Sequence, residues 1–297
     1  SSASEGIVGD AEIADRPLTR TGEILEFIPG MVVTQHSGSG KANQYFLRGF
    51  NLDHGTDFAS YVDGMPVNMR SHGHGQGYTD LSFLIPELVS QIDYQKGAYH
   101  ANSGDFSAAG VARFGIQNRT RNEAELTLGM DNYQRLLVKG NMKQGQADVL
   151  LAGELQQYDG PWTDIAEDVD KLNLLARYSK SLGSGQFAVT FMAYDNSWNA
   201  ADQIPQRAVQ QRLIDALGSL DTSVGGQSSR NSVSASWYSD AWQWNAYAIQ
   251  SELDLWSNFT YFLNDPINGD QFEQVDERWI YGGELSRHWH QQWGEFA

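Results

Sequence analysis

The chain contains no cysteine among its 297 residues. This absence excludes a disulfide framework, a thiolate metal site and a cysteine nucleophile. Basic residues are also scarce, since 20 Lys and Arg stand against 37 Asp and Glu and give a formal net charge of −17. Because phosphate neutralisation needs clustered basic residues, this charge argues against a nucleic-acid partner. No apolar run approaches the roughly 18 residues that a membrane-spanning helix requires.

Aromatic residues and glycine are abundant. The chain has 9 Trp, 13 Tyr, 13 Phe and 30 Gly, while only 19% of its residues are charged. Such enrichment without long apolar runs is typical of a membrane β-barrel, whose strands are apolar on one face and whose interfaces carry aromatic girdles. A soluble all-β protein can have a similar composition, so composition alone leaves both classes open.

The character of the sequence changes near residue 118. Residues 1–118 combine a short amphipathic helix at Thr21–Ile28, for which Thr21 is the expected N-cap, with short strands and Gly-rich loops. This pattern predicts a small α+β domain. Residues 119–297 instead alternate apolar and polar positions, as in Ser232–Trp237, which is the signature of half-buried strands.

Eight strands are expected in the second part, near 122–130, 133–143, 147–158, 171–181, 186–197, 230–239, 242–263 and 277–290. Most connections alternate in length, with tight links at 144–146, 182–185 and 240–241 and long links at 159–170, 198–229 and 264–276. Short turns on one side and long loops on the other are the layout of an outer-membrane barrel. The sequence therefore predicts an antiparallel membrane β-barrel, incomplete in this chain, with an apolar outer face and a polar inner face.

Several segments of residues 1–118 resemble the plug domain of TonB-dependent outer-membrane receptors. They are LEFIPGMVV at 25–33, FLRGF at 46–50, YVDGMPV at 61–67, IPELVSQIDYQKG at 85–97 and a Gly/Ala-rich run ending at Gly110. Their order and spacing match the whole plug. The resemblance implies that 1–118 is a plug and that 119–297 is the first part of a barrel of about 22 strands. The chain is thus expected to be a fragment.

The resemblance also implies a function. Such a receptor lies in the outer membrane of a Gram-negative bacterium, contacts its lipid, and imports an extracellular ligand such as a siderophore, a metal or a metal chelate. The proton-motive force drives this import through TonB and its inner-membrane complex, so no cofactor is expected. The alternative is a surface receptor that binds or senses a ligand or glycan without importing it. No segment before residue 20 resembles a TonB box.

No catalytic residue is expected, because fingerprints such as His-Glu-x-x-His and Gly-x-Ser-x-Gly do not occur. The chain is therefore not expected to be an enzyme. The plug motif residues Arg48, Gly49, Asp63 and Gly64 are expected to be structural. Glycine permits tight turns, and the charged side chains can pair with residues of the barrel lumen.

Five of the seven histidines lie in the first part of the chain, within Gly/Ser/Asn-rich loops, and are candidate ligand-binding residues: His36, His54, His72, His74 and His100. In plugs of the family, loops of this kind face the extracellular vestibule. His72 and His74 are two residues apart, so on an extended segment both would project to the same side and could chelate Zn or Cu. The alternative is that these histidines only provide solubility and hydrogen bonds to the barrel wall.

Overall fold

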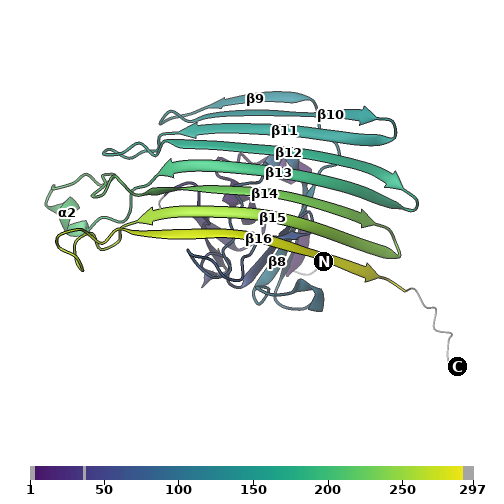
Figure 1. The fold of residues 1–297 in the computed structure, drawn as a ribbon, viewed down its shortest axis with the longest axis horizontal. Coiled ribbons are helices and arrows are strands. Elements are labelled where there is room, and N and C mark those ends of the chain that lie inside the picture. Colours follow the sequence, from purple (N-terminus) through teal and green to yellow (C-terminus); the bar gives the residue numbers. More distant parts are fainter. Residues whose placement is uncertain (1–3, 36–37, 290–297) are drawn as a thin grey trace.

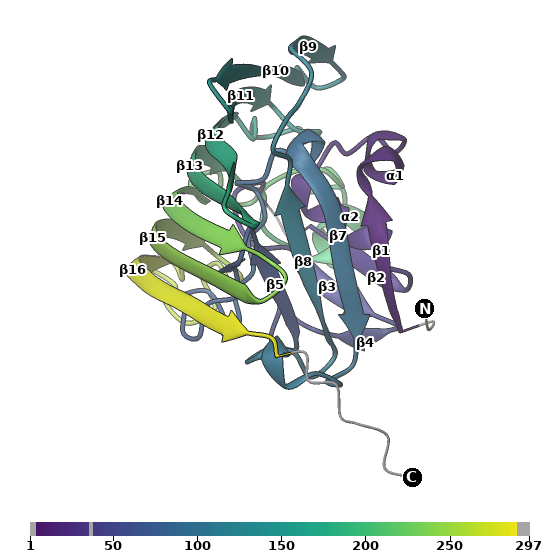
Figure 2. The same ribbon diagram turned by 90° about the vertical axis from the view of Figure 1, so that its right-hand side faces the viewer.

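The structure, a computed structural model, describes residues 4–35 and 38–289. It contains an eight-stranded sheet, a five-stranded sheet of order β1-β7-β8-β5-β6 and a three-stranded sheet of order β2-β3-β4. The eight-stranded sheet curves into a wall, and the two smaller sheets lie on its concave side (Figure 1, Figure 2). No helix in these two ranges is long and apolar enough to cross a membrane.

The wall is an antiparallel meander in which each strand pairs with the next. Its strands are β9 (Glu123–Leu128), β10 (Gln134–Gln144), β11 (Ala147–Tyr158), β12 (Val169–Leu182), β13 (Gly185–Asn199), β14 (Gly225–Tyr238), β15 (Trp242–Ser257) and β16 (Phe272–Arg287). The long connections, including the one that holds α2 (Gln206–Gln210), share one end of the wall, which we name the loop end (Figure 1). The opposite end, with its short hairpins, is the turn end.

This wall confirms the expected fold class, although three expected boundaries were wrong. β16 begins at Phe272, five residues before the expected residue 277. β15 ends at Ser257 and not at residue 263, because Tyr261 has a left-handed φ of 60° and its N–H donates to the Asn258 side chain. β14 begins at Gly225, five residues before the expected start. The sequence did not indicate these five residues, because they have no apolar alternation that could reveal a strand.

The N-terminal unit, which we call the plug, packs on the wall. Its elements are β1 (Glu5–Gly9), α1 (Asp10–Ala14), η1 (Thr21–Phe27), β2 (Met31–Thr34), β3 (Gln44–Leu47), β4 (Phe50–Asn51), β5 (Phe58–Val62), β6 (Met65–Pro66), η2 (Pro86–Leu88), β7 (Val89–Lys96), η3 (Ala101–Ser103) and β8 (Gly110–Ile116). Residues 117–122 link β8 to β9, so the expected boundary at residue 118 falls within this link and stays a prediction.

One element of the plug differs from the expected α-helix. The segment Thr21–Phe27 is a 3₁₀ helix whose cap position is Arg20, without a side-chain cap. Pro29 disfavours a helical conformation at Ile28, which is extended with ψ of 117°. The helix is therefore too short for stable α geometry, and short 3₁₀ segments are common in such places.

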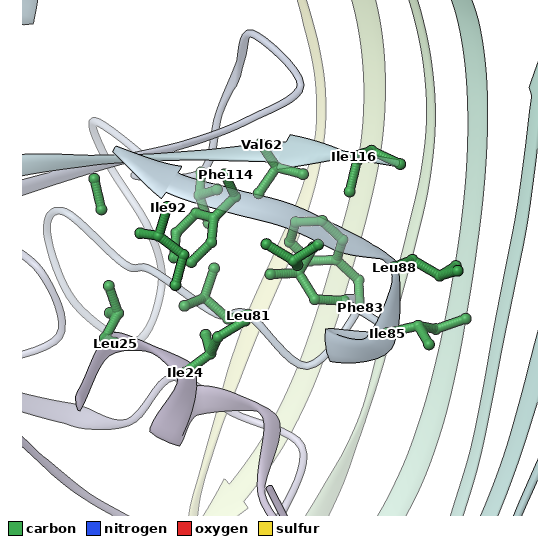
Figure 3. Close-up of a cluster of buried hydrophobic side chains, with 14 of the residues drawn as sticks. Ile24, Leu25, Val62, Leu81, Phe83, Ile85, Leu88, Ile92, Phe114 and Ile116 are labelled. Carbon is green, nitrogen blue, oxygen red and sulfur yellow. The ribbon is translucent and has the colours of Figure 1, made fainter. Parts of the chain in front are cut away.

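The plug has its own apolar core. Ile24 and Leu25 of η1 face Ile92 of β7 and Phe114 of β8, with Leu81 between them, and all five side chains are at most 1% exposed (Figure 3). Full burial of such a side chain stabilises the fold by about 1.5–3 kcal/mol. The core therefore holds the plug strands together and leaves its polar edges to meet the wall.

The two faces of the wall differ in polarity. Outward-facing Leu151, Leu174 and Phe191 remain 44–45% exposed, whereas inward-facing Asn173 is fully buried. The inner face is less polar than expected, because apolar residues also pack against the plug: Leu137, Leu150, Leu175, Met192 and Ile249. The plug and the wall thus meet through a mixed apolar and polar interface.

Candidate functional site

Two tight hairpins hold the plug motif residues. Arg48 and Gly49 join β3 to β4 with φ values of 54° and 80°, and Asp63 and Gly64 join β5 to β6 with φ values of 50° and 82°. Two-residue hairpin loops with positive φ at both positions are type I′ turns, which favour glycine at the second position. The side chain of Arg48 makes no ion pair with the described residues, whereas Asp63 points at the wall.

Asp63 binds three strands of the wall. Its Oδ2 accepts hydrogen bonds from Arg177 Nη1 on β12 at 2.7 Å and from Thr190 Oγ1 on β13 at 2.7 Å. Ser234 Oγ on β14 also donates to it at 3.2 Å. The Asp63 and Arg177 side chains are 9% and 7% exposed. Water competes poorly for such a buried pair, so this turn fixes the plug against the wall.

A second buried ionic group lies at η2. Arg135 on β10 donates from Nη1 and Nη2 to the two carboxylate oxygens of Glu87, at 2.7 and 2.9 Å. Arg135 also pairs with Glu154 on β11, which accepts from Lys171 Nζ on β12 at 2.8 Å. Asn173 Nδ2 connects Glu154 to the plug carbonyl of Ser82. Because the fork of Arg135 matches a carboxylate, this contact fixes orientation as well as position.

The plug loop 38–41 packs on Trp198 near the loop end of β13. A Cβ atom added to Gly40 would lie 1.9 Å from the Trp198 ring, so a side chain is excluded there. Ser228 Oγ on β14 donates to the Gly40 carbonyl at 2.9 Å. Ser39 Oγ donates to Glu167, a buried carboxyl of the loop between β11 and β12. The glycines of this loop therefore permit close approach to the wall.

The structure places four of the five candidate histidines, in two different settings. His54, His72 and His74 come together in the plug, with His54 and His74 ring centroids 4.6 Å apart. His100 precedes η3 and is exposed, away from this cluster. His36 lies outside the described residues, so its expected role stays a prediction.

The histidine cluster borders the wall strand β16. His74 Nδ1 lies 2.9 Å from Gln274 Oε1, and His72 Nε2 lies 3.8 Å from Asp276 Oδ1. His72 also stacks on Tyr78, with ring centroids 3.8 Å apart. Burial is the main reason that the pKa values of His72 and His74 are lowered to about 4, which leaves both imidazoles neutral near pH 7.

Over residues 4–35 and 38–289, no group of three or more His, Cys, Asp or Glu side chains is arranged to hold a metal ion. Any metal bound at the histidine cluster would therefore need donors from another molecule. Neutral imidazoles suit borderline metals such as Cu and Zn, and the metal role expected of His72 and His74 stays a prediction.

Two large cavities lie between the plug and the wall. One of about 970 Å³ is at the loop end and is lined by Arg20 and Ser39 of the plug together with Tyr133, Tyr158 and Trp162. The other cavity, of about 500 Å³, is bordered near the turn end by the following polar and aromatic residues: Tyr61, Asp63, Arg113, Trp244 and Glu284. The loop-end cavity is large enough for a small molecule.

Several residues of this interface were not expected from the sequence. The alternation of residues 119–297 puts Arg135 and Arg177 on the polar inner face, but the sequence does not indicate that Glu87 and Asp63 of the plug are their partners. Gln274 and Asp276 lie about 200 residues from the histidines that they contact. Only the three-dimensional arrangement brings these residues together.

Comparison with known proteins agrees with this arrangement. Residues 1–111 match the family model "TonB-dependent Receptor Plug Domain". The copper transporter OprC has a similar fold, with a TM-score of 0.72 at 16% identity over 98% of this chain and 44% of that chain. The ferric enterobactin receptor PfeA of Pseudomonas aeruginosa has a TM-score of 0.63 at 15% identity, over 98% of this chain and 48% of that chain. The FrpB iron transporter of Neisseria meningitidis has a TM-score of 0.62 at 15% identity, over 85% of this chain and 41% of that chain.

The fold and the plug–wall contacts define a plugged β-barrel protein whose sheet is not closed within the described residues. Residues 1–111 belong to the TonB-dependent receptor plug domains, and the whole chain has the fold of a plug followed by barrel strands, as in a fragment of such a receptor. It spans less than half the length of the solved receptors that it resembles. This identification agrees with the expectation that the chain is not an enzyme.

Proposed function

We propose that the protein is an outer-membrane receptor of a Gram-negative bacterium that binds a specific extracellular ligand and imports it. TonB and its inner-membrane complex would relay the proton-motive force to the plug. In this proposal the plug comprises residues 1–118 and the barrel part residues 119–297. The exposed apolar side chains of the wall would contact outer-membrane lipid, and the loop end would face the cell exterior.

The observation that supports import most directly is the way in which the plug is held. Glu87 and Asp63 bind the wall through partly buried ionic hydrogen bonds at 2.7 Å. A wide barrel without a plug would leak solutes. Polar contacts can be exchanged for water when the plug moves, because the net stability of a hydrogen bond is small compared with its gross strength. A plug held in this way can close the barrel and still be displaced.

The ligand class that the site favours is a metal or a metal chelate. The similar structures are those of a copper transporter, a ferric enterobactin receptor and an iron transporter, and these cargoes are those of the similar proteins. In this chain, the neutral imidazoles of His72 and His74 and the large loop-end cavity support the same class. The cavity is large enough for a carrier molecule around the metal.

An alternative function is glycan binding without import. Tyr133 and Tyr158 form an edge-to-face pair with centroids 5.8 Å apart at the loop-end cavity, and Trp162 lines it as well. Aromatic rings beside carboxyl and amide groups provide stacking and hydrogen bonds for a sugar. An aromatic girdle explains rings near the ends of barrel strands equally well.

The test compares uptake and surface binding in the native host. Accumulation of radioactive copper and zinc is measured in cells that express the full-length receptor, with and without the tonB gene. We expect that uptake in the tonB deletion strain falls to the level of a receptor deletion strain, while metal binding to intact cells persists. Binding of a labelled glycan with no TonB-dependent uptake of either metal would support the alternative.

A further inference from the structure

The backbone around Lys41 of the plug is held on both sides. The carbonyl of the preceding residue, Gly40, accepts a hydrogen bond from Ser228 Oγ on β14 at 2.9 Å. The N–H of the following residue, Ala42, donates to Tyr78 Oη at 3.1 Å. One of these contacts comes from the wall and the other from the plug, so the point from which the Lys41 side chain extends is fixed relative to both.

The ammonium group of Lys41 is buried without a counter-ion in contact with it. The residue is 6% exposed, and its Nζ forms no ion pair and no hydrogen bond with any residue in the ranges 4–35 and 38–289. Burial lowers the pKa of Lys41, and the longer-range attraction of Asp202 offsets this effect only in part. A buried charge without a partner is costly, so the position of this ammonium calls for an explanation.

Lys41 lines a pocket of about 50 Å³ between the plug and the wall, which we call the Lys41 pocket. The pocket adjoins the loop-end cavity, since five residues line both: Thr19, Arg20, Gln35, Ser39 and Gln156. One water molecule needs about 10–15 Å³ of such space. The Lys41 pocket therefore has room for a few water molecules or for one small group of a ligand that occupies the larger cavity.

The charges around the Lys41 pocket are unusual for a chain with a net charge of −17. Three cationic residues line the pocket, namely Arg20, Lys41 and Lys171, and none of the described residues that line it is Asp or Glu. Most of the other lining side chains are amides and hydroxyls, which can donate hydrogen bonds. Such a lining favours an anion over a cation or an apolar group.

Two of the three cations already have carboxylate partners. Arg20 Nη2 lies 2.5 Å from Glu23 Oε1, and Lys171 Nζ lies 2.8 Å from Glu154 Oε1. Lys41 is therefore the cation of this pocket whose three N–H donors are not used by the described residues. Hydrogen bonds between an ammonium and an oxyanion are roughly twice as strong as neutral ones, so an oxyanion would offset the cost of burying Lys41.

We propose that the Lys41 pocket binds an oxyanion, a carboxylate or a phosphate, that is part of the incoming ligand, with Lys41 Nζ as its main donor. The inference rests on the proposed function, because it describes one end of the ligand that the loop-end cavity would receive. A metal chelate that carries a free carboxylate or phosphate is then favoured over a chelate that lacks one. A bare metal ion gains nothing from this pocket, since an ammonium repels cations.

The test uses the full-length receptor purified from outer membranes and titrated calorimetrically with citrate and, separately, with inorganic phosphate. We expect at least one of them to bind. Lys41→Met keeps an unbranched side chain and removes the charge, so it should weaken this binding by at least about tenfold. Lys143→Met is the matched control, because Lys143 is exposed near the turn end of β10, and it should bind like the wild type. Preference for citrate or for phosphate distinguishes the two oxyanions.

A melting measurement separates ligand binding from a structural role of Lys41. In the ligand-free receptor, Lys41→Met removes a buried charge that has no partner, so the variant should melt at the same temperature as the wild type or higher. Addition of the bound anion should raise the melting temperature of the wild type more than that of the variant. A lower melting temperature of the ligand-free variant, an unchanged affinity, or the failure of both anions to bind would overturn the proposal.

Uptake measurements distinguish failure of this proposal from failure of the proposed function. TonB-dependent uptake combined with an anion affinity that Lys41→Met does not change would remove the role of the Lys41 pocket and leave the transport function standing. Anion binding that depends on Lys41, without any TonB-dependent uptake, would support the pocket and contradict import.

Discussion

Among the individual residues of the interface, Glu167 is an unusual carboxyl group. It lies in the loop between β11 and β12, is 3% exposed and accepts hydrogen bonds from Ser39 Oγ and from Trp162 Nε1. Burial raises the pKa of Glu167, and these two hydrogen bonds offset only part of that effect. A single carboxyl group therefore couples the plug loop 38–41 to the wall in a pH-dependent way.

The sign of this dependence follows from the raised pKa. The folded chain holds the Glu167 proton more tightly than the unfolded chain, whose pKa is about 4.3. The contribution of this group to stability is therefore complete below about pH 4 and declines as the pH rises toward the folded-state pKa. Glu167→Gln should remove the decline, so the melting temperature of the variant should exceed that of the wild type at pH 7 but not at pH 4.

Differential scanning calorimetry of the full-length receptor in detergent measures this difference. Asp168→Asn is the matched control, because Asp168 is the next residue, is exposed and has a left-handed φ of 48° that asparagine tolerates. The control should follow the wild type at every pH. Equal pH profiles for the wild type and Glu167→Gln would show that Glu167 is ionised at no cost in the folded protein.

Between elements, the strongest polar contact joins η2 to β10 and β11. Arg135 lies between Glu87 and Glu154, and its side chain is 9% exposed. Arg135→Ala would leave Glu154 buried with Lys171 as its remaining cation. Removal of one partner from a buried ion pair costs about 3–5 kcal/mol, so this variant should lower the free energy of unfolding by about that amount.

Guanidinium unfolding of the full-length receptor, followed by circular dichroism, measures this loss. Glu87→Ala should cost less than Arg135→Ala, because Arg135 keeps its partner Glu154. Glu123→Ala is the control, since Glu123 pairs with Lys139 at 3.2 Å, is 45% exposed and should cost less than about 1 kcal/mol. If Arg135→Ala behaved like Glu123→Ala, the ionic group would not hold the plug.

The same elements show how far the sequence predicts the fold. Alternation predicted all eight strands of the wall, because the period of two is set locally by one buried face. It did not predict β1 or β8, since Gly110–Ile116 begins in a Gly/Ala-rich run and its burial comes from neighbouring strands. For the site, the local sequence predicted that His72 and His74 lie together. The approach of His54 and Gln274 depends on tertiary packing, which a local pattern does not contain.

For the whole molecule, the outer face of the wall decides where the protein resides. Leu136, Leu151, Leu174, Phe191 and Val233 lie on the neighbouring strands β10 to β14, and each is 40–45% exposed. Together they form a broad apolar surface. In water such a surface would favour aggregation, whereas in a membrane it would contact lipid.

Leu174→Arg tests this interpretation, because Leu174 lies near the middle of β12 and faces outward. An arginine at the midplane of a bilayer costs a barrel about 2–4 kcal/mol, so less of the variant should reach the outer membrane in folded form. Gln210→Arg, on the exposed helix α2 at the loop end, adds the same charge outside the lipid and should have no effect.

The measurement is the amount of folded receptor in isolated outer membranes. Folded receptor is distinguished from unfolded chain by its altered electrophoretic mobility without heating. Equal amounts for the two variants would mean that the outer face does not contact lipid at Leu174. A selective loss of Leu174→Arg would place the middle of β12 inside the bilayer and, with it, the plug interface on the opposite face of the same strand.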